Sequence, residues 1–311
     1  MIKKTLYFGN PAYLSLKSEQ LVIKLPEVEK NDTLPESFKR SNEKSLPIED
    51  LGVVVLDHKQ ITITHGLIEK LLDNNVVIIT CDSRRMPVGL MLPLCGNTTQ
   101  NERFTDQLSA SEPLKKQLWQ QTIKAKITNQ AEVLSRYRSC NIKNMLHWAN
   151  EVRSGDPDNF EARAAAYYWG QAFPQVENFT RDREGIAPNN LLNYGYAILR
   201  AIVARALVSS GLLPTLGIHH HNRYNAYCLA DDIMEPYRPF VDQIVFDMAD
   251  KGTIPEELSI DHKAKLLRLP DIDVMIGGRM SPLMLAVAQT TASLYQCFDG
   301  STRKIKYPEL P

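Results

Sequence analysis

The sequence predicts an α+β protein, in which a small N-terminal β-sheet domain precedes a larger all-α C-terminal domain. Short runs of β-branched residues crowd the first 92 positions, whereas apolar residues beyond position 94 recur near the helical period. A polar segment separates the two patterns. A chain of 311 residues suits one large or two medium domains.

The N-terminal domain is expected to span residues 1–94. Its strands are predicted where β-branched residues cluster between turn residues, at 21–25, 53–56, 61–63, 76–80 and 88–92. Thr64 is a candidate cap for a short helix at 65–72. The polar segment 27–45 has few apolar anchors, so it is expected to be a long loop.

Residues 95–101 are the predicted linker, and 102–300 the helical domain. Apolar residues spaced three to five apart predict the first long helix, at Leu114, Leu118, Ile123, Ile127, Ala131 and Leu134. Further helices are expected at 160–173, 189–210, 229–235, 239–250 and 282–298. Residues 301–311 are basic and are expected to form a flexible tail.

The composition is that of an ordinary soluble protein, with 43% hydrophobic and 23% charged residues. Basic and acidic residues number 36 each, which argues against a uniformly basic nucleic-acid binder. The five cysteines include no Cys-x-x-Cys pair, as expected in a reducing cytoplasm. Asn193, Arg200 and Arg205 interrupt the most apolar stretch, which therefore predicts a buried helix rather than a membrane span.

The charge is uneven along the chain. Residues 113–153 carry a net charge of +6, because only Glu132 and Glu151 oppose eight basic residues, namely Lys115, Lys116, Lys124, Lys126, Arg136, Arg138, Lys143 and Arg153. Such a stretch suits contact with a polyanion. A solvated helix face explains it equally well.

The segment from Gly217 to Pro239 is the strongest candidate for chemistry. Three consecutive histidines, at 219–221, lead into a predicted helix that carries acidic residues at 231, 232 and 235. Positions 232 and 235 share one helix face, where like charges repel unless a cation intervenes. Arg238 or a metal ion would meet that need. The simpler interpretation of Asp231 is a solvated helix residue.

The three histidines cannot all point at one site from a regular strand, because alternate side chains face opposite ways. Mixed histidine and carboxylate ligands suit manganese, magnesium or zinc. A polar loop without any ligand role also fits the histidine run.

Glu161 is a second candidate. It falls in the first turn of the helix predicted from Phe160, which Asp158 or Asn159 would cap. A carboxylate is favoured there by the helix dipole, so Glu161 also fits a purely structural first-turn role.

At these segments the sequence resembles the family of CRISPR-associated adaptation integrases, the metal-dependent nucleases of spacer acquisition. The likeness covers the whole chain. The segments that carry it are residues 46–56, 155–169, 189–196 and 217–239. The motifs His-His-x-Asn and Leu-Ala-Asp-Asp-x-Met-Glu resemble most closely those of family members from systems with a single large RNA-guided effector nuclease.

The resemblance implies that the helical domain is catalytic, with Glu161, His220 and Glu235 as ligands of Mg²⁺ or Mn²⁺. Asp232, His219 and Asn225 are auxiliary candidates. The implied reaction is insertion of short foreign DNA fragments as new spacers, by attack of a 3′-hydroxyl on phosphodiesters of the CRISPR repeat. Hydrolysis of branched DNA would use the same chemistry with water as the nucleophile.

The resemblance also implies partners. These are fragment and repeat DNA, a second copy of the chain joined through the N-terminal domain, and a small ferredoxin-like second adaptation protein in a heterohexameric complex. An RNA-guided effector nuclease and an accessory adaptation protein are further candidates. The expected location is the bacterial cytoplasm, without membrane contact. Three other readings stay open: a structure-specific nuclease without integration, a non-enzymatic DNA scaffold, and a zinc hydrolase that uses His219 and His221.

Overall fold

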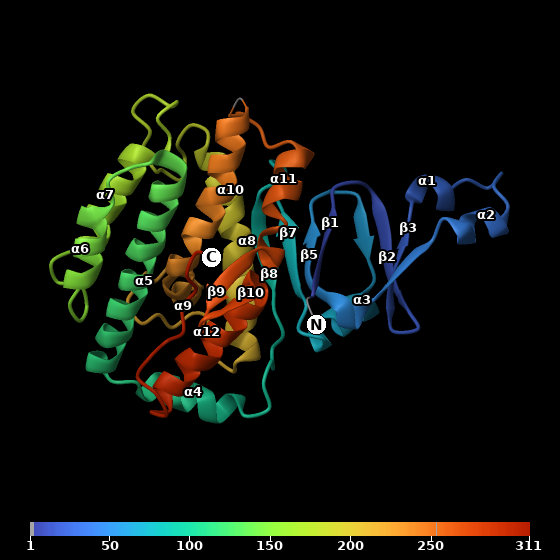
Figure 1. Ribbon diagram of the computed structural model, residues 1–311. Helices are drawn as coiled ribbons and strands as arrows, with labels where there is room; N and C mark the ends of the chain where they lie inside the picture. The colour runs from blue at the N-terminus through green and yellow to red at the C-terminus, as the bar shows by residue number, and fades with distance from the viewer. Residues whose placement is uncertain (1–2, 253) are drawn as a thin grey trace. The chain divides into compact units, whose positions relative to one another are not determined.

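The computed structural model describes residues 3–252 and 254–311, and the chain forms two compact units (Figure 1). Unit 1 ends at Gly96 and unit 2 begins at Asn97. This boundary falls inside the segment 95–101, where the sequence predicts a linker. The last part of that segment is helical, because helix α4 (Gln100–Ser109) begins there.

Unit 1 contains two four-stranded sheets. In the first, the strand order is β1 (Lys4–Phe8), β5 (Leu51–Leu56), β7 (Val77–Cys81) and β8 (Pro87–Met91). β5 is parallel to both neighbours, and β8 is an antiparallel edge strand. The inner strand β5 has its first five residues fully buried, which explains its continuous run of apolar residues.

The second sheet has the order β4 (Lys44–Pro47), β3 (Gln20–Lys24), β2 (Ala12–Lys17) and β6 (Ile61–Ile63). Helix α3 (His65–Asp73) follows β6, as Thr64 predicts, although the Thr64 side chain makes no capping hydrogen bond. Leu67 and Leu71 of α3 pack with Leu14 and Val54 in the core of the unit.

The segment 27–45, expected to be one long loop, is more regular than predicted. It contains the short helices α1 (Pro26–Glu29) and α2 (Glu36–Ser41) and the start of β4. Neither helix has a buried residue. The apolar periodicity on which the sequence prediction depends is therefore missing, and prolines at positions 26 and 35 instead mark the helix starts.

Unit 2 is mainly helical. Besides α4 its helices are α5 (Glu112–Arg138), α6 (Lys143–Glu151), α7 (Phe160–Ala172), α8 (Asn189–Ser209), α9 (Cys228–Met234), α10 (Arg238–Lys251), α11 (Ile260–Leu266) and α12 (Leu283–Phe298). Short 3₁₀ turns lie at Glu235–Tyr237 and Leu269–Asp271, and another lies at Ile48–Asp50 in unit 1.

Helix α8 runs through the centre of unit 2 and contacts α9, α10, α11 and α12 (Figure 1). By length and hydropathy alone it would pass as a membrane span. However, 78% of its most apolar window is buried inside the unit. Its apolar side chains are therefore used in packing against neighbouring helices, as the charged interruptions in its sequence predict.

The C-terminal unit is not all-α. Strands β9 (Asp273–Ile276) and β10 (Arg279–Pro282) form an antiparallel hairpin. Gly277 and Gly278 form its two-residue turn, both with positive φ (58° and 75°), which requires the freedom of glycine. The strands are only four residues long, too short for their alternation to stand out in the sequence.

Residues 301–311 are expected to form a flexible tail, but the structure packs them onto unit 2. Glu309 bridges to Met275, and the Tyr307 hydroxyl lies 2.7 Å from Thr122 Oγ1. Ile305 and Leu310 are buried. The basic residues of this segment predict a flexible tail, and that prediction is wrong. Apolar residues lie among the basic ones, and their buried side chains anchor the segment to unit 2.

Candidate metal centre

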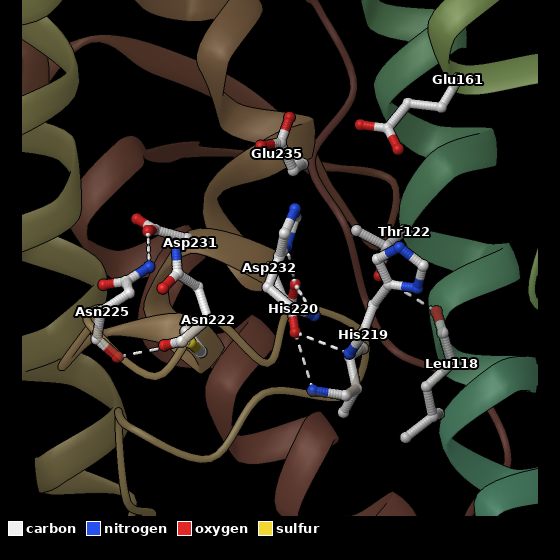
Figure 2. Close-up of polar contacts among 12 residues, drawn as sticks. Leu118, Thr122, Glu161, His219, His220, Asn222, Asn225, Asp231, Asp232 and Glu235 are labelled. Carbon is white, nitrogen blue, oxygen red and sulfur yellow. Dashed lines mark hydrogen bonds and ion pairs between the residues drawn. The ribbon is translucent and has the colours of Figure 1, made fainter. Parts of the chain in front are cut away.

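Helix α7 and the two segments that flank helix α9 bring together the residues singled out in the sequence (Figure 2). Glu161 lies on α7, His220 in the loop before α9, and Glu235 at the 3₁₀ turn that follows α9. The carboxylates of Glu161 and Glu235 both reach the ammonium of Lys126, at 2.6 Å from Oε1 and Oε2 respectively. The two acids therefore face one small volume.

Glu161 owes its position to Asp156. The Asp156 carboxylate accepts hydrogen bonds from the backbone N–H of Phe160 (3.0 Å) and of Glu161 (2.9 Å), which fixes the first turn of α7. Asp158 and Asn159, the predicted caps, do not play this part. Asp158 pairs with Arg153, and the backbone of Asn159 is left-handed with no side-chain cap.

Glu235 is held at a break between two helices. Pro236 and Pro239 prevent α9 from running straight into α10, and the intervening 3₁₀ turn presents Glu235. Arg238 Nε lies 2.9 Å from Oε1 of this buried side chain. Burial by itself would raise the pKa of Glu235, but Arg238 and Lys126 outweigh it and hold that pKa below its ordinary value. Glu235 is thus ionised.

The histidine loop is built around the Asp232 carboxylate, which is fully buried. It accepts backbone hydrogen bonds from Ile218 (2.7 Å), His219 (2.9 Å) and His220 (3.2 Å). Gly217 allows this approach, since a Cβ there would lie 2.7 Å from Asp232 Oδ2 and 2.4 Å from the His220 carbonyl oxygen. Both oxygens of Asp232 are therefore used to shape the loop.

Asp232 also orients the His220 ring, whose Nδ1 lies 2.5 Å from Oδ1. This hydrogen bond raises the pKa of His220. With Nδ1 carrying the proton, Nε2 is the nitrogen that presents a lone pair. The arrangement of carboxylate and imidazole is the one that commonly supports a histidine ligand of a metal ion.

The neighbouring histidines are placed differently. The His219 ring stacks on Trp119 of α5, with ring centroids 4.1 Å apart and planes within 2°. Burial lowers the pKa of His219, so the ring is neutral near pH 7. His221 is exposed, and so are His219 and His220, so exposure does not separate the three. Their contacts do, because His219 stacks on Trp119, whereas His220, the histidine that the resemblance implies as the ligand, bonds to Asp232.

Asp231 and Asn225 belong to a separate cluster. Asp231 is not the solvated residue that the sequence suggests, because it is buried and pairs with Arg200 at 2.6 Å. Asn225 donates to its other oxygen at 2.7 Å. Figure 2 shows Asn225 and Asp231 together, on the far side of Asp232 from Glu161. Asn225 therefore supports the loop before α9 rather than the carboxylate pair.

Helix α5 contributes residues to the site that no motif in the sequence singles out. Trp119, Thr122, Lys126 and Asn129 repeat at three- and four-residue spacing along one buried face. Asn129 donates to the carbonyl oxygens of Pro236 (2.8 Å) and Pro308 (2.9 Å), next to Glu235. In the sequence these residues fall within the apolar pattern that predicts the long helix, so their burial could have been expected. That pattern does not show which residues of other elements they contact.

The donor set fits a divalent ion. Among residues 3–252 and 254–311, no three histidine, cysteine or acidic side chains converge closely enough to hold an ion as they stand. Lys126 lies between the two carboxylates instead. Glu235 Oε2 nevertheless has no hydrogen-bond partner, although it is buried. Glu161, Glu235 and Nε2 of His220 are oxygen and nitrogen donors of the kind that magnesium and manganese accept.

The basic stretch 113–153 is not one free cationic face. Five of its eight basic residues have carboxylate partners, namely Lys115, Lys126, Arg136, Arg138 and Arg153. Lys126 is buried, and the Arg138 side chain is only 8% exposed. Carboxylates from elsewhere in the chain therefore offset much of the local +6 charge.

A pocket of about 360 Å³ opens beside His220. Its cationic and polar lining includes Lys115, His221 and Arg223, and Leu216 and Phe298 contribute apolar surface. The pocket is large enough for part of a substrate next to His220.

Comparisons with known proteins identify the family to which the chain belongs. The family model described as CRISPR associated protein Cas1 matches residues 6–269. A CRISPR-associated endonuclease Cas1 from Neisseria meningitidis serogroup C is 34% identical over 312 aligned residues, covering 100% of this chain and 97% of that protein. A second Cas1 endonuclease, from Pyrobaculum aerophilum, is 29% identical and covers 73% of this chain and 80% of its own length.

Solved structures share the fold. A casposase bound to its integration product superposes with a TM-score of 0.76 at 21% identity, covering 98% of this chain and 92% of that one. A Cas1 protein from Thermotoga maritima gives a TM-score of 0.72 at 14% identity, covering 96% and 97%. The match of the family model over most of the chain and the full-length relative place this protein in the Cas1 family of CRISPR-associated proteins.

Proposed function

We propose that this chain is a divalent-metal-dependent DNA endonuclease and integrase that inserts short foreign DNA fragments into a CRISPR array. The observation that supports this most directly is that the carboxylates of Glu161 and Glu235 both lie 2.6 Å from the Lys126 ammonium. The His220 ring, oriented by Asp232, lies beside them. The casposase with a similar fold was solved with an integration product, which fits the same chemistry.

The side chains of this cluster have distinct tasks in the proposed reaction. Glu161, Glu235 and Nε2 of His220 would hold Mg²⁺ or Mn²⁺. Asp232 keeps the proton on Nδ1, and Arg238 neutralises the second oxygen of Glu235. When bound, the ion supplies positive charge that stabilises the developing charge on the phosphate and on the leaving oxygen.

The nucleophile distinguishes the two activities. A fragment 3′-hydroxyl attacking a repeat phosphodiester forms a new phosphodiester and releases the 3′-hydroxyl of the repeat strand. Water attacking the same phosphorus gives hydrolysis. Both reactions need the same charge stabilisation, so one cluster would serve both. The pocket beside His220 is a suitable place for nucleotides that flank the reacting phosphate.

The proposed partners follow from the family. Structures with a similar fold include a Cas6-RT-Cas1–Cas2 complex, in which this chain covers 36% of the matched chain, and a Cas1–DNA complex. We therefore propose that this chain pairs with a second copy, and that a small ferredoxin-like adaptation protein joins the pairs in a heterohexamer on DNA. An RNA-guided effector nuclease and an accessory adaptation protein are further proposed partners, in the bacterial cytoplasm.

The test is a strand-transfer assay with the small partner protein, labelled fragment DNA and a supercoiled plasmid that carries the repeat. Wild-type protein with Mg²⁺ or Mn²⁺ is expected to join label to the plasmid, and Glu235→Gln is expected to bind DNA without joining it. Glu132→Gln is the matched control, because Glu132 lies on the exposed side of α5, paired with Arg136.

Each alternative function predicts a different result in this assay. Hydrolysed ends without joined products would indicate a nuclease that does not integrate. Joining or cleavage by Glu235→Gln at the wild-type rate would remove this cluster from the mechanism, and a wild-type protein that only binds DNA would be a scaffold. Activity with zinc alone, lost in His219→Ala and His221→Ala, would favour a zinc hydrolase.

A further inference from the structure

Lys126 occupies the centre of the cluster rather than its edge. Its ammonium lies 2.6 Å from Glu161 Oε1 and 2.6 Å from Glu235 Oε2, and its side chain is only 11% exposed. Lys126 is therefore a buried cation held between the two acids that the proposed function assigns to the metal.

A divalent ion and this ammonium cannot share the position. Magnesium binds carboxylate oxygens at about 2.0–2.1 Å, so an ion bridging the two acids would fall where the ammonium now lies. Charge leads to the same conclusion. Glu161 and Glu235 are balanced by Lys126 and Arg238, and an added divalent ion would leave the buried cluster with excess positive charge.

The two cations differ in how easily they can leave. The Arg238 guanidinium lies 4.7 Å from the Tyr196 ring centroid and contacts the other oxygen of Glu235. Its planar group is fixed on two sides. The ammonium of Lys126 ends a flexible four-carbon chain, donates a hydrogen bond to Glu161 Oε1 and contacts Glu235 Oε2 as an ion pair. Arg238 Nε also lies outside hydrogen-bond geometry, so the difference between the two cations is the flexible chain of the lysine against the planar, stacked guanidinium. Lys126 is the one that can move.

We propose that Lys126 is the built-in counter-cation of the metal-free site, and that a divalent ion loads by exchange with its ammonium. The lysine keeps two facing carboxylates from repelling each other before the ion arrives. It also sets the threshold concentration for loading, because the ion must compete with it. This inference rests on the proposed metal site.

The experiment compares Mn²⁺ binding to the full chain without DNA, by titration calorimetry and by electron paramagnetic resonance of free Mn²⁺. Lys126→Met is expected to bind Mn²⁺ at least ~10-fold more tightly than wild type, because the competing cation is gone. Without metal its Tm should be lower by roughly 5–15 °C, and Mn²⁺ should restore most of that loss. Lys124→Met is the control, since it removes a lysine from another side of the same helix.

Lys126→Arg provides a second measurement that does not depend on the folding of Lys126→Met. It keeps the charge but holds it with a planar, multidentate group, so Mn²⁺ should bind more weakly than to wild type. Equal affinity in wild type, Lys126→Met and Lys126→Arg would refute the exchange while leaving the metal site intact. No Mn²⁺ binding by any of the four proteins, Lys126→Met included, would overturn the metal site itself, and the exchange with it.

Discussion

Asp232 and His220 form the tightest link in the site, with Oδ1 and Nδ1 2.5 Å apart. The same carboxylate holds the backbone N–H groups of residues 218–220, so one buried acid fixes both the path of the loop and the tautomer of the ring. Asp232 is thus a positioning residue. Its oxygens are already occupied, and it does not face Lys126 as Glu161 and Glu235 do.

Replacement of Asp232 by asparagine is expected to reduce strand transfer by about 10- to 100-fold, the usual cost of losing the carboxylate behind a histidine ligand. The amide keeps one acceptor but cannot hold both sets of donors, so the protein should also lose about 1–3 kcal/mol of stability. Strand-transfer rates and urea unfolding measure the two effects. Wild-type activity in a destabilised Asp232→Asn would show that the acid serves only the fold.

The three histidines should differ sharply when each is replaced by alanine. His220→Ala is expected to abolish strand transfer, because the buried Asp232 holds this imidazole close to Glu235 (Figure 2). His219→Ala should cost about 1 kcal/mol of stability through loss of the stack on Trp119, with a smaller effect on the rate. His221→Ala should be close to wild type. Strand-transfer assays rank the variants, and comparable losses at His219 and His220 would contradict the assignment.

The start of helix α7 offers a test of how Glu161 is held. Asp156→Ala removes the acceptor for two backbone N–H groups and should destabilise the protein by about 1–2 kcal/mol, with a fall in strand transfer because Glu161 is released. Asp158→Ala is the matched control on the surface and should change stability by less than about 0.5 kcal/mol. Urea unfolding of both variants decides whether Asp156 is the cap.

Asp242 should make the stability of the protein pH-dependent. Its buried carboxylate accepts hydrogen bonds from the hydroxyls of Tyr168 (2.9 Å) and Tyr196 (2.6 Å). Burial raises the pKa of Asp242 to about 6, from 3.8 in an exposed aspartate, despite those bonds. The native state therefore keeps a proton that the unfolded chain has released between these values.

Because the native state binds more protons in this interval, its stability falls as the pH rises from about 4 to 6, and this contribution is constant above. The loss is about 3 kcal/mol. Asp242→Asn cannot titrate, so its stability relative to wild type should increase by that amount over the same interval. Urea unfolding from pH 4 to 8 measures it. A difference that does not change with pH would show that Asp242 titrates as in the unfolded chain.

Much of the fold could be predicted from the sequence, because the spacing of apolar residues reflects which face of a helix or strand is buried. Helices α5 and α8 and strand β5 have apolar residues at the spacing that their buried faces require, and they are where the sequence predicts them. The hairpin of β9 and β10 and the last eleven residues were missed for the opposite reason. Their anchors are few, and partners distant in the chain, such as Met275 for Glu309, hold them.

By itself the sequence determined the two-part organisation and, through its resemblance to a family, the candidates Glu161, His220 and Glu235, because helical spacing and short motifs are local properties. Only the tertiary structure showed the different contacts of the three histidines and the position of Lys126 between the acids. These contacts join side chains from α5, α7, the histidine loop and the turn after α9, which are brought together when the buried faces of the helices pack. Separation along the chain carries no information about such a meeting, so no spacing rule could have revealed it.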